Sequence, residues 1–91
     1  MTSMFTVVGV DALTVDLHSS EPSYQQVARQ LRERIKSGEI GPGEPLPSIT
    51  RIQQETGLAV NTVRHAIDVL VEEGYVYTVP GRGTYAAPRP G

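Results

Sequence analysis

Apolar residues recur at spacings of three and four along three stretches of the chain, which predicts three amphipathic helices. The first is expected over about 22–37, the second over about 49–56, and the third from 60 or 61 to about 73. Gly38, Gly57 and Gly74 fall at or just beyond the expected ends, where helices often stop. Because only a short turn around Gly57 separates the last two helices, the pattern predicts a helix-turn-helix.

After Gly74 the pattern changes to β-prone residues interrupted by a turn sequence. Residues 75–79 predict a strand, 80–83 the tip of a hairpin, and 84–87 the returning strand. A helix-turn-helix followed by a hairpin predicts an α+β fold of the winged helix-turn-helix type over residues 21–87. Residues 88–91 are expected to form a flexible tail.

The first twenty residues have a mixed pattern that fits two structures. Residues 5–10 and 13–17 are β-prone, and 13–17 alternate apolar and polar side chains. This alternation favours a short edge strand, and the alternative is a flexible N-terminal arm. The arm is also our candidate for self-association.

Length and composition narrow the class of protein. Ninety-one residues make one small domain, and 38% hydrophobic with 5% aromatic residues predict a modest aliphatic core. There is no cysteine, no long apolar run and no cationic signal peptide at the start. These features lead us to expect a cytoplasmic protein that makes no contact with a membrane.

The charge argues against a nucleic-acid partner at first sight, because the formal net charge is -2. The distribution is uneven, however. Residues 1–21 carry three acids and no Lys or Arg, whereas all eight basic residues lie from Arg29 to Arg89. Charge alone favours a protein that does not bind nucleic acid. A prediction of DNA binding therefore has to rest on the residue types at particular positions.

The polar side of the third predicted helix carries the best candidates for DNA contact. Asn pairs with adenine, Arg pairs with guanine, and Thr contacts a phosphate or a thymine methyl group. The candidates on this helix are Asn61, Thr62, Arg64 and His65, and those at the hairpin tip are Gly81, Arg82 and Gly83. Two glycines make the tip slim enough for a minor groove, where Arg82 would meet negative potential. Taken singly, these residues also fit an ordinary helix surface and a solvent turn.

The sequence offers no catalytic constellation. The two histidines, His18 and His65, lie far apart and neither has metal-ligand spacing with a partner. Glu72 and Glu73 end a helix, which indicates a solvated helix end. We therefore expect no enzyme activity, no cofactor and no metal.

Several short motifs run in order through residues 22–87: Pro22-x-Tyr24-x-Gln26, Ile35-x-x-Gly38-x-Ile40-x-x-Gly43-x-x-Leu46-Pro47-Ser48, Gly57-Leu58, Thr62-Val63-Arg64-x-Ala66-Ile67, Glu73-Gly74-Tyr75-Val76 and Gly81-x-Gly83-Thr84-Tyr85. In these motifs the chain closely resembles the N-terminal winged-helix domain of the GntR family of bacterial transcription regulators. The resemblance implies a recognition helix in the major groove and a wing tip in the minor groove. It places the family's contact positions on Thr62, Arg64 and Gly81. It also makes Ser48, Thr50 and Arg51, around the start of the second helix, candidates for DNA contact.

The chain departs from the family pattern in two respects. Ala59 and Val60 stand where members usually carry Ser-Arg, and Thr50 stands where they carry Arg, with Arg51 one position off. Because Ala is a poor cap, the third helix is expected to begin ragged or to be capped late by Asn61. Members also usually continue into a C-terminal domain that binds a metabolite. This chain ends after the wing, so we expect no small-molecule effector.

Together these observations predict a sequence-specific regulator that binds a double-stranded DNA operator as a homodimer, and most simply a repressor. The first alternative is a winged helix that acts as a protein-interaction module or adaptor. A small hydrolase or transferase is the second alternative, and the missing catalytic set argues against it.

Overall fold

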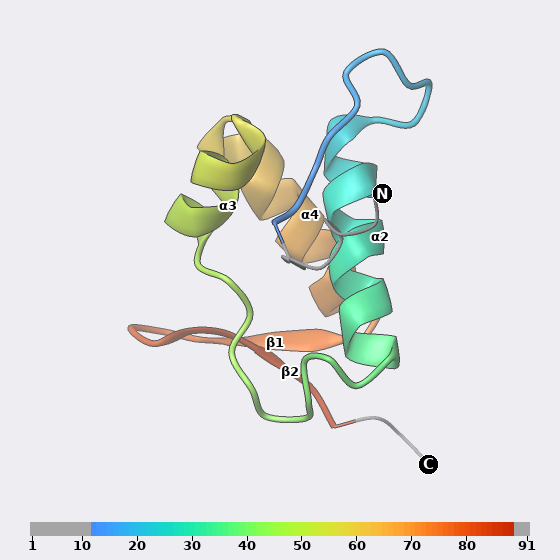
Figure 1. Cartoon of the computed structure of the whole chain (residues 1–91). Coiled ribbons are helices and arrows are strands. Elements are labelled where there is room, and N and C mark those ends of the chain that lie inside the picture. Colours follow the sequence, from blue (N-terminus) through green and yellow to red (C-terminus); the bar gives the residue numbers. More distant parts are fainter. Residues whose placement is uncertain (1–11, 89–91) are drawn as a thin grey trace, which may run out of the picture.

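The computed structural model describes residues 12–88. These residues form three helices and a two-stranded antiparallel sheet (Figure 1): α2 (Ser23–Lys36), α3 (Ile49–Thr56), α4 (Val60–Glu72), β1 (Val76–Val79) and β2 (Gly83–Ala86). The α+β winged helix-turn-helix expected from the sequence is confirmed. The helix bounds agree with those expected to within about a residue, and the strands begin about one residue away. Residues 89–91 of the tail expected at 88–91, and the β-prone segment 5–10, lie outside the described residues.

The helices pack around a small aliphatic core because each buries one apolar stripe. α2 and α4 pack against one another, and α3 packs against α4. The buried hydrophobic side chains are Leu13, Val27, Ala28, Leu31, Ile35, Leu46, Ile52, Val63, Ala66, Ile67, Leu70, Val76 and Ala86. This set leaves the opposite side of α4 exposed, which makes that side available to a partner.

Two local features hold α3 and α4 in the helix-turn-helix arrangement. The Ser48 side chain caps α3 by accepting a hydrogen bond from the Arg51 N–H at 3.0 Å. At the other end Gly57 adopts φ +77° and donates its N–H to the Gln53 carbonyl at 2.7 Å. This left-handed backbone suits glycine, since a Cβ is strained there. The turn therefore redirects the chain into α4 within three residues.

The wing is a short hairpin in which Val76 pairs with Ala86 and Val79 pairs with Gly83. Its tip is closed by a hydrogen bond from the Arg82 N–H to the Val79 carbonyl at 2.9 Å. Gly81 (φ +78°) and Gly83 (φ +133°) take backbone conformations that side chains rarely adopt. The two glycines thus keep the tip both tight and slim.

The loop between α2 and α3 runs along the free edge of β2 and anchors the base of the wing. The Gly43 N–H donates to the Ala86 carbonyl, and the Leu46 N–H donates to the Thr84 carbonyl. Pro45 forms an isolated bridge with Tyr85. As expected from the sequence, Leu46 is buried and Ile40 packs against the core. The wing is therefore braced by backbone hydrogen bonds on the β2 side as well as by β1.

The short strand expected at 13–17 is not formed, and this prediction was wrong. Residues 12–16 run in extended form between α2 and α3 (Figure 1) without any strand beside them. We call this segment the strap. Its alternation does place Leu13 in the core, where it is 1% exposed, and Val15 against the core, while Leu17 is 75% exposed. The predicted inward side of the alternation is therefore confirmed for Leu13 and Val15 but not for Leu17, and the predicted partner strand is absent from the described residues.

Side chains replace the missing strand as hydrogen-bond partners of the strap. The Gln26 side chain accepts from the Asp16 N–H at 2.8 Å and donates to the Asp16 and Glu21 carbonyls at 2.9 and 2.8 Å. Gln30 pairs in the same two-way manner with the backbone of Thr14. Because amides can both donate and accept, they satisfy an extended backbone as a neighbouring strand would. The folded unit consequently includes the strap.

No helix within residues 12–88 is long and apolar enough to span a lipid bilayer.

Candidate nucleic-acid interface

The N-terminus of α4 has no side-chain cap. The helix begins at Val60, and its N-cap residue, Ala59, makes no side-chain hydrogen bond. The expected weak cap is thereby confirmed. The alternative in which Asn61 caps the helix late is wrong, since Asn61 already lies inside α4. Its exposed side chain makes no hydrogen bond to another described residue, so its amide is available to a partner.

A groove of about 610 Å³ lies between α4 and the wing. Arg64 and Asp68 line it from the helix, and the tip glycines Gly81 and Gly83 line it from the wing. The remaining lining residues are Ile49, Ile67, Thr78, Val79, Pro80 and Thr84. The structure therefore brings the recognition-helix arginine and the wing tip, which lie well apart in the sequence, to opposite sides of one groove.

Ion pairing divides the basic residues into two groups. Arg29, Arg32, Arg34 and Arg51 each pair with a glutamate at 4.0 Å or less. Within residues 12–88, three basic side chains have no such partner: Lys36, Arg64 and Arg82. Two of these three are candidates on α4 and the wing. An unpaired guanidinium keeps its full charge and its donors for an external anion.

Arg82 lies apart from the groove, on the other face of the wing. It lines a shallow hollow with Gly43, Tyr77, Val79 and Tyr85. The Tyr77 and Tyr85 rings stack there with their centroids 5.9 Å apart. Side chains alternate across a strand, so Tyr77 and Tyr85 face away from Thr78 and Thr84, which line the groove. Arg64 and Arg82 therefore line hollows on different sides of the hairpin.

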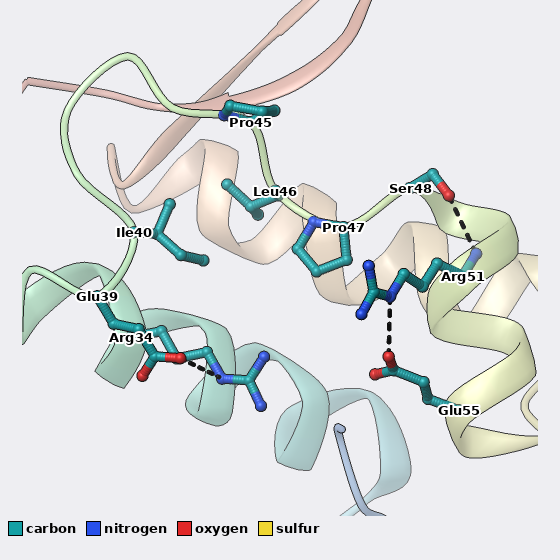
Figure 2. A pocket seen from close by; sticks show the side chains of 9 residues that line it. All are labelled: Arg34, Glu39, Ile40, Pro45, Leu46, Pro47, Ser48, Arg51 and Glu55. Atoms are coloured by element: carbon teal, nitrogen blue, oxygen red, sulfur yellow. Dashed lines mark hydrogen bonds and ion pairs between the residues drawn. The ribbon is translucent and has the colours of Figure 1, made fainter. Parts of the chain in front are cut away.

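Ser48 and Arg51 line a different pocket, between the end of α2, the following loop and α3 (Figure 2). Ser48 is used as the α3 cap, and the Arg51 Nε donates to the Glu55 carboxylate at 3.0 Å. Arg34 and Glu39 form a second ion pair in the same pocket. Neither Ser48 nor Arg51 lines the groove between α4 and the wing. Thr50, between them, is exposed and makes no hydrogen bond to the described residues.

Glu55 connects this pocket to the strap. Burial would raise the pKa of its carboxyl, but the hydrogen bond from the Leu13 N–H and the hydrogen bond and charge of Arg51 lower it more. The net result is a pKa below the ordinary value, with a smaller contribution from the charge of Arg34. Glu55 is therefore charged at neutral pH and holds the strap against α3.

His65 is also occupied within the fold. Its ring stacks on Tyr24 with the centroids 3.8 Å apart and the planes 14° apart. This contact joins the first turn of α2 to the middle of α4, so the His65 ring lies against protein on one face. Thr62 is half-buried in the first turn of α4.

Sequence reasoning missed two features of this side of the molecule. Asp68 was not among the candidate site residues, although its spacing of four from Arg64 places both on one helix face. The hydrogen bonds of Gln26 and Gln30 to the strap are the second feature. Gln26 belongs to one of the family motifs, but the sequence assigned no role to it or to Gln30, because nothing in a single sequence states which backbone an amide will meet.

Comparisons with known proteins agree with this geometry. The family profile described as "Bacterial regulatory proteins, gntR family" matches residues 23–86. The HTH-type transcriptional repressor NagR of Bacillus subtilis is 39% identical over 75 residues, which is 82% of this chain and 31% of NagR. The chain thus spans about a third of that curated relative.

Solved structures share the fold as well. YtrA from Sulfolobus acidocaldarius, a GntR-family transcription factor, superposes with a TM-score of 0.78 at 35% identity, covering 87% of this chain and 83% of YtrA. The DNA-binding domain of AraR, solved in complex with operator ORX1, superposes with a TM-score of 0.72 at 36% identity, covering 74% and 81% of the two chains. The unpaired arginine of α4, the glycine-flanked wing tip and these matches lead to one conclusion: the chain belongs to the GntR family of bacterial regulatory proteins.

Proposed function

We propose that this chain binds a specific duplex DNA operator and regulates transcription, with α4 in the major groove and the wing tip in the adjacent minor groove. The observation that carries the proposal is the groove lined by Arg64 on one side and the wing tip on the other. A helix of 13 residues is about 20 Å long, and the major groove is about 12 Å wide and accepts a helix. The sugar-phosphate strand between the two DNA grooves would then lie between α4 and the wing.

The contact set we propose divides by chemistry. Asn61 and Arg64 read base edges, and Thr62 and Thr50 contact phosphates or a thymine methyl group. Gly81 and Gly83 let the wing approach the minor groove, where Arg82 meets its negative potential. Ser48, Arg51 and His65 have partners within the chain, and we propose that they support this surface and reach DNA less directly.

Repression and dimerisation on DNA are also part of the proposal. NagR is a named repressor, and AraR was solved on an operator, which supports repression through an operator here. One copy has few unpaired basic side chains and would bind one half-site weakly. Two copies joined as a dimer would bind a palindrome more tightly, because binding of the first copy raises the effective concentration of the second. A homodimer on DNA is therefore proposed. The adaptor alternative is not favoured, because Arg64 and Arg82 are free of carboxylate partners among the described residues.

We also propose that residues 12–88 bind no small-molecule effector. The pocket in Figure 2 measures about 480 Å³, but its four charged side chains already form the pairs Arg34–Glu39 and Arg51–Glu55. A charged metabolite would have to displace one of them. A metabolite that binds saturably and changes operator affinity would contradict this part of the proposal.

The decisive experiment is selection of bound sequences from a random duplex pool with the 91-residue chain. We expect an enriched palindrome with a spacing of about one helical turn between half-sites. Arg82→Ala should leave the central motif intact and weaken the preference for A·T pairs beside it. Failure of the wild-type chain to enrich any duplex would overturn the proposed function.

A further inference from the structure

Asp68 is the feature of the groove that a DNA-binding surface does not explain. Of the described acidic residues, only Asp68 lines the groove between α4 and the wing. Its side chain is exposed and has no hydrogen bond or ion pair within residues 12–88. A carboxylate is repelled by phosphates, so a free one in this position weakens DNA binding unless it makes a specific interaction with a base.

The position of Asp68 on α4 places it with the base-reading candidates. At 100° per residue, Asn61, Arg64 and Asp68 fall within an arc of roughly 60°. This arc lies opposite the buried Val63, Ala66 and Leu70. Asp68 follows Arg64 by about 6 Å along the helix axis, which is on the order of two base-pair steps. The three side chains therefore form one line along the face of α4 that would enter the major groove.

A simple pairing with Arg64 does not account for Asp68. The two residues are four apart in the helix, yet no ion pair joins them, whereas Arg51 and Glu55 at the same spacing are 3.0 Å apart. The order with the cation on the N-terminal side is also the weaker one for helix stability. Arg64 and Asp68 thus present a donor and an acceptor side by side, each without a partner among the described residues.

The chemistry of base edges indicates which base the acceptor fits. A carboxylate only accepts hydrogen bonds, so the O6 and N7 of guanine and the O4 of thymine repel it. Adenine offers its N6 amino group beside its own acceptor N7, whereas cytosine offers its N4 amino group and has no acceptor of its own in the major groove. We propose that Asp68 is a specificity-determining residue that accepts a hydrogen bond from the N4 amino group of a cytosine near the base contacted by Arg64. The inference rests on the proposed operator binding.

The substitution Asp68→Asn tests this inference, because Asn has the same shape but pairs with the N6 and N7 of adenine. Sequences selected by wild type and by Asp68→Asn from the same random duplex pool are compared. At one position of each half-site, we expect the preference to change from cytosine to adenine, by roughly ten-fold, while the other positions stay the same. Glu72→Gln is the matched control, since it removes a carboxylate one turn further along α4 and outside the groove. It should leave the selected motif unchanged.

The outcomes separate the two proposals. An enriched wild-type motif that Asp68→Asn reproduces without change overturns the role of Asp68 and leaves operator binding standing. If Asp68→Asn tightens binding to every duplex and steepens the salt dependence with the same motif, the carboxylate faces phosphate and the base contact is overturned. If wild type enriches no motif, both proposals fail. Equal thermal unfolding midpoints for the three proteins show that a change in motif does not come from a loss of folding.

Discussion

Two sides of this small domain differ in how their polar groups are bonded. The strap side consists of residues 12–16 and the faces of α2 and α3 beside them, and the groove side consists of the exposed face of α4 and the wing. On the strap side, Gln26, Gln30 and Glu55 satisfy the extended backbone, and the arginines nearby are paired with glutamates. On the groove side, Arg64 and Asp68 have no such partners within the described residues, and α4 begins without a side-chain cap. Both sides are built around the same core and differ in how many of their polar groups lack hydrogen-bond or ion-pair partners.

The difference teaches where stability and binding reside in this chain. Hydrogen bonds made within the protein stabilise the folded state, while exposed charges left unpaired contribute little to folding and remain available to a partner. Substitutions on the strap side should therefore change unfolding and leave DNA selection alone. Substitutions of the unpaired charges on the groove side should change DNA selection and leave unfolding nearly the same.

Replacing Leu13 should give the largest effect. Leu13→Ala removes a side chain that is 1% exposed and leaves a cavity, so we expect a loss of about 2–5 kcal/mol in the free energy of unfolding. Urea denaturation measures it. Leu17→Ala, close by in the chain but exposed, should stay within about 0.5 kcal/mol of wild type. Equal losses for the two variants would show that the strap is not part of the core in solution.

Replacing Arg64 tests the groove side. Arg64→Ala should cost about 1–3 kcal/mol in operator binding because a base contact is lost, with little change in thermal stability. Fluorescence anisotropy on the selected operator at fixed salt is the measurement. Lys36→Ala is the control, since Lys36 is also unpaired within residues 12–88 but lies at the end of α2. If both variants bind equally well, the groove does not face DNA.

Restoring the family residues at the start of α4 should affect both properties. Ala59→Ser supplies a cap that Ala59 lacks and should stabilise the protein by about 0.5–2 kcal/mol. Adding Val60→Arg should strengthen DNA binding and steepen its salt slope by about one charge for each phosphate that the new arginine neutralises. Thermal unfolding and salt titration of the single and double variants separate the two effects. A rise in stability without a change in slope would mean that position 60 does not face DNA.

The smallest expected effect concerns pH and Glu55. The folded-state pKa of Glu55 is lowered, so its contribution to stability is present above the ordinary carboxyl pKa and is lost as pH falls through the folded value. Glu55→Gln keeps an acceptor for the Leu13 N–H but removes the charge. We expect it to be less stable than wild type at pH 7 by about 1 kcal/mol, with the gap closing below about pH 4. A gap that stays constant as the pH falls from neutral to well below the ordinary carboxyl pKa would contradict this assignment.

Most of the fold was predictable because its signals are local. The stripes of α2, α3 and α4, the glycine after α3 and the glycine-flanked tip each specify an element within a few residues. The strap was predicted wrongly for a physical reason. An alternating segment needs a partner for its backbone, and local pattern does not reveal whether that partner is a strand or the side chains of a helix further along the chain.

The candidate site was predictable in part for the same reason. Residue type singled out Arg64 and Arg82, and the structure leaves both without ion-pair partners among residues 12–88. The sequence alone could not separate Arg51 from Arg64, because the pairing of Arg51 with Glu55 depends on side-chain geometry. It could not foresee the stacking of His65 on Tyr24 either, since those residues come from different helices.

The three hydrogen bonds of the Gln26 side chain also restrict which residues can replace it. One amide group accepts from Asp16 and donates to two carbonyls, and its residue is only 4% exposed. Glutamate of the same length would lose both donors and bring a buried negative charge toward those carbonyls, and a shorter asparagine would not span the distance. Among related chains, glutamine here should therefore occur together with an alternating segment shortly before the helix, and the two should be lost together.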